Sequence, residues 1–220
     1  MDGVPLAFVF AMTTAVLWGF TPILSKRAMA GGASSLQGAL VVVTVDSVLY
    51  WAAILWRQGV DLSANLTLET VAVFAVGGLV GTALGRLAVF TGVDRVGATI
   101  NTAGQNTRPV FAMVLAVLLL GERVTLVTVA GIVVLVVGLV LLSLAEGGDI
   151  GGWRPRDLVF PLSAALFFGV GNVIRKYALG AYPVTVLEAV AINETAATLG
   201  LLTFAVAAGR RDVVHAPRRS

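Results

Sequence analysis

The chain has 220 residues, of which 58% are hydrophobic and 12% are charged, and its mean hydropathy is +0.94. Soluble domains are roughly 45–50% apolar and about 25% charged, so this composition excludes a water-soluble globular fold. The net charge of +3 comes from Lys and Arg residues that stand singly or in pairs between apolar runs, which excludes the clustered basic face of a nucleic-acid-binding protein.

Several enzyme classes lack their usual residues here. The chain has no Cys and one His, His215, which lies near its C-terminus. Disulfides, thiolate metal sites, Cys nucleophiles and His-based triads are therefore excluded or nearly so. We expect no catalytic residues, no metal site and no cofactor.

The apolar runs predict seven membrane-spanning helices, because a bilayer crossing needs about 20 mostly apolar residues. In chain order they cover residues 4–24, 36–56, 70–92, 97–120, 124–145, 158–179 and 184–208. Short polar or Gly-containing breaks separate them, and Asp94-Arg95 is the break between the third and the fourth. The expected fold class is an all-α, polytopic membrane helix bundle.

An offset of 150 residues aligns the sixth and seventh runs with the first and second. Under this offset Trp18 aligns with Phe168 and Lys26 aligns with Lys176. Five runs separate the two copies, and because five is odd the copies would lie upside down relative to each other in the membrane. Inverted repeats of this kind are typical of secondary transporters.

The repeat predicts the division of the chain into parts. These are a complete five-helix repeat at 4–145, a linker at 146–157, the first two helices of an inverted second repeat at 158–208, and a polar, Arg-rich tail at 209–220. The same offset calls for three further helices. The tail is therefore either an ordinary soluble tail or the end of a truncated copy of a ten-helix protein.

A few ionisable residues interrupt the apolar runs, namely Asp46, Arg86, Arg108 and Glu194. A charge at mid-bilayer is costly, so each should face a protein interior or an aqueous cavity, with a partner. Because the signs are opposite and the depths similar, we expect Arg108 to pair with Asp46 or Glu194. Such a pair either fixes the helix register or belongs to a substrate or proton site.

The fourth run is the most polar. At 100° per residue Asn101, Gln105 and Arg108 fall on one stripe of the helix. Pro109 removes a backbone donor, which predicts a kink. We expect this helix to line a substrate cavity. Hydrogen bonding between helices through the Asn and Gln amides is the alternative.

Other positions extend the predicted substrate-binding set. Trp18 and Thr21 share a face of the first helix, and Asn172 stands in the second copy where the first has Pro22. All three are expected to face the cavity.

Glycines recur every four residues in the third run, at Gly77, Gly81 and Gly85. Small residues at this spacing allow a neighbouring helix to approach closely. We therefore expect this stripe to serve helix packing.

Three segments carry a family resemblance: Trp18-Gly19, the stretch from Pro109-Val110-Phe111-Ala112 to Leu120-Gly121-Glu122-Arg123, and the fifth run with Gly131 and Gly138. Together they resemble the EamA domain of the drug/metabolite transporter superfamily. The resemblance covers nearly all of 4–145 as one unit and 158–208 as the start of a second. It implies a ten-helix inverted-repeat carrier with a central cavity, and it leaves the substrate open.

The expected function is therefore a multi-pass secondary transporter of the plasma membrane. It would move amino acids, other small metabolites or drug-like compounds by alternating access. Asp46, Glu194 and Arg86 would either couple transport to an ion or form ion pairs. Its expected partners are the lipid bilayer and a small-molecule substrate. One alternative is a non-transporting remnant or subunit, completed by a second copy or by a complementary membrane protein. Another is a seven-helix receptor, but retinal would need a Lys within a helix, and Lys26 and Lys176 stand at helix ends.

Overall fold

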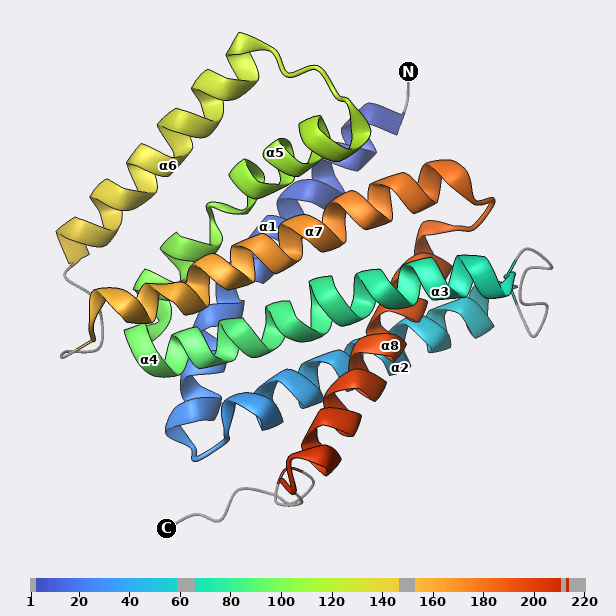
Figure 1. The fold of residues 1–220 in the computed structure, drawn as a ribbon, viewed down its shortest axis with the longest axis horizontal. Helices are drawn as coiled ribbons and strands as arrows, with labels where there is room; N and C mark the ends of the chain where they lie inside the picture. The colour runs from blue at the N-terminus through green and yellow to red at the C-terminus, as the bar shows by residue number, and fades with distance from the viewer. Residues whose placement is uncertain (1–2, 59–65, 147–152, 211–212, 214–220) are drawn as a thin grey trace.

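The structure is a computed structural model that describes residues 3–58, 66–146, 153–210 and 213, and its regular elements in these ranges are all helices (Figure 1). In chain order they are α1 Gly3–Ala30, α2 Ser35–Gln58, α3 Leu68–Gly77, η1 Gly78–Leu84, α4 Gly85–Gln105, α5 Arg108–Leu120, α6 Leu126–Glu146, η2 Pro155–Leu158, α7 Val159–Ala181 and α8 Val186–Ala207. The expectation of an all-helical protein is confirmed. Most of the predicted linker and tail, with His215, lies outside the described residues.

Five stretches of the described chain are long and apolar enough to cross a membrane: Phe8–Ala30, Ser35–Arg57, Leu68–Gln105, Pro155–Ala181 and Val186–Ala207. They contain the second, third and sixth predicted runs, most of the first and seventh, and the start of the fourth. The helices Arg108–Leu120 and Leu126–Gly138 are apolar but shorter. A membrane crossing by the fourth and the fifth run therefore stays a prediction.

The third and fourth runs meet at a sharp turn rather than at a polar loop. The predicted break at Asp94-Arg95 is wrong, because α4 stays helical through both residues. The helix turns instead at Gly97, where φ is 81° and ψ is 169°. Glycine takes this backbone conformation without a steric penalty because it has no Cβ. Figure 1 shows the chain changing direction in this part of α4.

The kink expected at Pro109 is a complete break in the helix. α4 ends at Gln105, and α5 begins at Arg108 with Pro109 in its first turn. The N–H of Asn106 donates to the carbonyl of Thr102 at 3.0 Å and closes the last turn of α4. Proline is tolerated in a first turn because the N–H that it lacks would have no partner within the helix. The fourth run is thus two half-helices that meet next to Arg108.

Helix α7 crosses the middle of the bundle, where it packs against α3, η1, α4 and α5 (Figure 1). The glycine stripe lies on this contact. A methyl group on Gly81 would lie 2.6 Å from the Cα of Gly171, and Gly85 lies against the ring of Phe168. Gly77 lies against Ile174. The backbones of η1 and α7 therefore approach as closely as two helices without side chains can.

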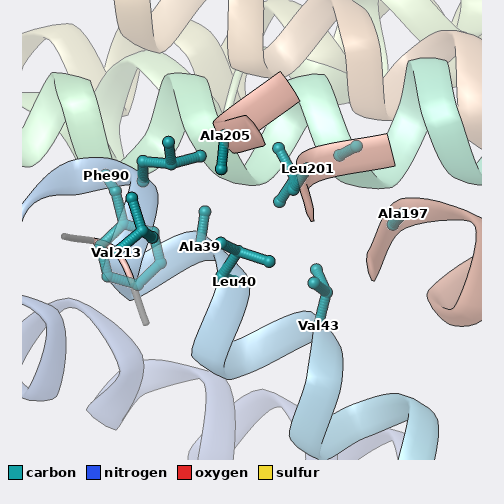
Figure 2. Packing of buried hydrophobic residues seen from close by; sticks show 10 residues of the cluster. Ala39, Leu40, Val43, Phe90, Ala197, Leu201, Ala205 and Val213 are labelled. Carbon is teal, nitrogen blue, oxygen red and sulfur yellow. The ribbon is translucent and has the colours of Figure 1, made fainter. Parts of the chain in front are cut away.

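A second contact joins α2 to α8 through an apolar cluster (Figure 2). Its members are small or branched side chains and one ring, labelled in the figure as Ala39, Leu40, Val43, Phe90, Ala197, Leu201, Ala205 and Val213. In contrast, α6 lies at the edge of the bundle, and its described side chains are exposed or half-buried.

The contact between Gly81 and Gly171 predicts a strict size limit. We expect Gly81→Ala to destabilise the protein by about 1–3 kcal/mol, because a methyl group there meets backbone that cannot move aside. The measurement is the Tm of the detergent-solubilised protein.

Gly131→Ala is the matched control, because a methyl group at Gly131 meets no atom within 4 Å. This change should leave the Tm equal or slightly higher, since Ala is the better helix former. Equal Tm values for the two variants would contradict the close contact.

Candidate functional site

Two adjoining cavities lie among α1, α2, η1, α4, α5, α7 and α8. The first has a volume of about 310 Å³, and we call it the amide cavity because Asn101, Gln105 and Asn106 line it. The second has a volume of about 540 Å³, and we call it the carboxylate cavity because Asp46 and Glu194 line it. Both cavities share the wall residues Trp18, Thr21, Ser25, Arg86, Arg108 and Phe168.

The structure brings the predicted polar and aromatic site residues together around these cavities. Asn101 and Gln105 line the amide cavity, and Asp46, Asn172 and Glu194 line the carboxylate cavity. The shared wall contains the remaining ones, Trp18, Thr21, Arg86 and Arg108. Of the predicted packing glycines, Gly81 lines the carboxylate cavity, while Gly77 and Gly85 lie against α7.

The ion pair at the site differs from the expected one. Arg86 Nη2 donates to Asp46 Oδ2 at 3.1 Å, with 14% of the Arg86 side chain and 31% of the Asp46 side chain exposed. The expectation that Arg108 pairs with Asp46 or Glu194 is wrong within the described residues, where Arg108 has no ion pair. The physical reason is position: Arg86 lies 3.1 Å from Asp46 and already compensates its charge, while Arg108 begins α5 and lies against aromatic rings.

Arg108 lies against aromatic rings instead. Its Cζ is 4.4 Å from the ring centroid of Phe168 and 5.6 Å from that of Trp18, and Arg86 Cζ is 5.5 Å from the Trp18 ring. A guanidinium within about 6 Å of a ring centroid is attracted by the π electrons of the ring. Trp18 and Phe168 are the residues that the 150-residue offset aligns, so Arg108 contacts corresponding positions of the two predicted copies.

Arg175 is a cavity residue that is absent from the predicted site residues. It lies six residues before Ala181, where α7 ends, and it lines the carboxylate cavity. With the Asn193 amide oriented so that its oxygen faces Arg175, Nη2 and Nε donate to that oxygen at 2.9 and 3.0 Å. The Asn193 nitrogen then donates to the carbonyl of Phe74. The signal available in the sequence was Asn193, a second polar residue beside Glu194 in an apolar run.

Hydrogen bonds beside the two carboxylates join α2 to α8. The hydroxyl groups of Ser47 and Thr195 lie 2.9 Å apart, and Trp51 Nε1 donates to Thr195 Oγ1 at 2.8 Å. Ser47 follows Asp46 in the chain, and Thr195 follows Glu194. These bonds therefore hold the backbone of both carboxylate residues in place.

The predicted helix-end residue Lys176 also has a defined partner. Its Nζ forms an ion pair with Glu122 Oε1 at 2.5 Å. Glu122 lies between α5 and α6 in the Gly121-Glu122-Arg123 turn. The pair ties this turn to α7.

Several buried polar atoms around the cavities have no hydrogen-bond partner within the described part of the chain: Asn101 Oδ1 and Nδ2, Thr102 Oγ1, Arg86 Nε and Glu194 Oε2. Nearly all buried polar groups in proteins are hydrogen-bonded, and an unpaired one costs about 1–3 kcal/mol. These atoms are therefore suited to bind a polar solute or water. Both donors and acceptors are present.

Comparison with known proteins identifies one family. The model of the EamA-like transporter family matches residues 5–144, which is more than half of the chain. Among curated proteins, none matches this sequence. The matched segment contains α1 to α5, nearly all of α6, and most of the amide cavity.

The Arg86–Asp46 pair predicts a non-additive effect on stability. Asp46→Asn and Arg86→Gln should each lower the free energy of unfolding, because each leaves a poorly solvated charge without its partner. The double variant should lose less than the sum of the two, by about 0.5–3 kcal/mol.

Denaturation midpoints in detergent measure this coupling. Arg95→Gln is the control, because Arg95 is an exposed arginine of α4. Strictly additive losses would contradict the ion pair.

Proposed function

The chain belongs to the EamA-like transporter family, and from this premise we propose that it is a secondary transporter that moves small metabolites, amino acids or drug-like compounds across the plasma membrane by alternating access. The observation that carries the proposal is the pair of adjoining cavities, enclosed by apolar helices and lined by buried polar atoms without partners. A buried polar cavity in a membrane helix bundle is costly unless it serves a solute. This arrangement is what a carrier needs at its substrate site.

In this proposal the shared wall and the amide cavity hold the substrate. Arg108 provides charge, while Asn101 and Gln105 provide amide donors and acceptors. Trp18 and Thr21 of α1 and Asn172 of α7 contact the substrate from the other side of the wall. Because these residues come from different helices, a bound substrate would bridge elements that alternating access must move.

The carboxylate cavity would couple transport to protons. Glu194 is 7% exposed, and its Oε2 has no hydrogen-bond partner within the described residues. Asp46 is engaged by Arg86, so Glu194 is the carboxylate that is available to bind a proton. Arg175 lines the same cavity from α7 and would balance the charge of Glu194 when it is ionised.

An inverted repeat supports alternating access by rocking of one copy against the other. Trp18 and Phe168, which correspond under the offset, both contact Arg108. The corresponding helices α2 and α8 pack against each other. A two-fold relation between the copies would produce both contacts.

A subunit that needs a second chain is the alternative, and the exposure of α1 favours it. This helix lines both cavities, yet most of its described side chains are exposed, and Trp18 itself is 44% exposed. A second copy or a complementary membrane protein would cover this face. Size-exclusion chromatography with light scattering in detergent separates a monomer from either assembly.

Transport is tested with purified protein in proteoliposomes and a mixture of radiolabelled amino acids. We expect uptake above that of empty vesicles, and at least a tenfold loss in Arg108→Gln, because the substrate loses a charged partner in a poorly solvated site. The control Arg95→Gln should keep the wild-type rate. Uptake by Arg108→Gln at the wild-type rate would remove Arg108 from the site.

Proton coupling is tested with Glu194→Gln, which keeps the shape of the side chain and cannot release a proton. We expect this variant to exchange substrate down its gradient while losing accumulation driven by a pH gradient. Counterflow and gradient-driven uptake, measured in the same vesicles, separate the two activities. Unchanged accumulation would exclude Glu194 from coupling.

A further inference from the structure

We propose that the amide cavity is a carboxylate-binding subsite, and that the substrate is a small organic monocarboxylate with an apolar body. The inference rests on the proposed transport function, because it names the class of solute that the same site would carry. It is drawn from charge balance, unused hydrogen-bonding atoms, a helix terminus and the apolar wall of this cavity.

The charge balance favours a single negative charge. The described residues that line the amide cavity include Arg86 and Arg108 but no Asp or Glu. Arg86 is already neutralised by Asp46, which it contacts from the side of the carboxylate cavity. One positive charge, that of Arg108, is left without a counter-charge. A monoanion would balance it, whereas a phosphate dianion would leave a net negative charge in an apolar bundle.

The hydrogen-bonding geometry of Arg108 suits a carboxylate. The rings of Phe168 and Trp18 lie against the guanidinium, and Arg108 has no hydrogen-bond acceptor within the described residues. A guanidinium has five N–H donors in its plane, and aromatic rings that cover its faces leave these donors available. Two parallel N–H donors match the two oxygens of a carboxylate.

Asn101 provides the second, independent observation. The residue is 1% exposed, it lines the amide cavity, and neither Oδ1 nor Nδ2 has a hydrogen-bond partner in the described part of the chain. Thr102 Oγ1, on the next residue, is also buried without a partner. An amide N–H and a hydroxyl group are donors that a carboxylate oxygen would accept from. A bound carboxylate would thus accept from Asn101 Nδ2 and Thr102 Oγ1, two donors that are otherwise costly to bury, whereas the acceptor Asn101 Oδ1 lies against Gly92.

The break between α4 and α5 places a helix N-terminus beside the cavity, and its electrostatic field favours an anion. α5 has 13 residues and begins at Arg108, so its N-terminal end lies beside the amide cavity. The N-terminus of a helix carries a partial positive charge. In transporters, half-helix N-termini point at the anionic groups of substrates.

Part of the cavity wall is apolar. Ala15 of α1, Val89 and Val93 of α4, and the two aromatic rings form this part. A hydrocarbon group attached to the carboxylate would pack there. A short branched carboxylate therefore matches both parts of the cavity.

The proposal is tested by the Tm of the purified full chain in detergent, titrated with matched probes. 4-Methylpentanoate and L-leucine contain the carboxylate, while L-leucinamide and 3-methylbutylamine lack it. We expect the two carboxylates to raise the Tm in a saturable manner and the other two probes to leave it unchanged. Inorganic phosphate, which also represents the headgroup of a lipid, should have no effect.

The variants locate the binding. Arg108→Gln should weaken 4-methylpentanoate binding at least tenfold, and Arg108→Lys should weaken it less, because the charge stays while the paired donors are lost. Arg95→Gln should bind as the wild type does. If Arg108→Gln does not fold, Arg108→Lys and the probe series still show whether a carboxylate binds at Arg108.

Several outcomes would overturn the subsite. These are equal stabilisation by L-leucinamide, equal stabilisation by phosphate, or carboxylate binding that Arg108→Gln and Arg108→Lys leave unchanged. Uptake of other solutes in proteoliposomes without carboxylate binding would reject the subsite and keep the proposed function. Carboxylate binding without any transport would keep the subsite and reject the function.

Discussion

A charge inside an apolar helix bundle is costly unless a partner compensates it, and several contacts of this molecule answer that constraint. Arg86 is balanced by Asp46 across α4 and α2, and Arg175 is held by Asn193 of α8. The more exposed Lys176 pairs with Glu122 in the turn before α6. Each partnership joins two different elements of the bundle. The charges therefore fix which helices meet, while the glycines and alanines between them fix how closely.

Much of the architecture could be predicted from the sequence. The apolar runs are long, so α2, α6, α7 and α8 begin and end within two residues of the runs that predict them, and the charged and amide residues within the runs surround the cavities. This success has a simple cause, since polar groups in an apolar bundle have few places to lie other than a shared interior. The prediction needs no knowledge of how the helices pack.

Pairing and helix ends were harder to predict. Charge sign and depth in the sequence do not distinguish Arg86 from Arg108 as the partner of Asp46, and the structure shows that the partner is Arg86. Arg175 lies only a few residues before the end of the predicted run at 158–179, and the sequence does not show its contact with Asn193. Asp94-Arg95 marks the turn in the sequence only to within a few residues, because the turn itself lies at Gly97 and depends on a backbone conformation that only the folded structure reveals.

The winding of η1 also bears on the ion pair between Arg86 and Asp46. A π-helix closes its hydrogen bonds between residues i and i+5, so it contains more residues per turn than an α-helix. If one such turn tightened to α-helical winding, every residue after it would rotate by about 100° around the helix axis. Arg86 follows η1 directly, so this change would carry its guanidinium away from Asp46 while α2 stayed in place. A change in local winding would thus break the Arg86–Asp46 ion pair by rotating α4 about its own axis, without tilting the helix.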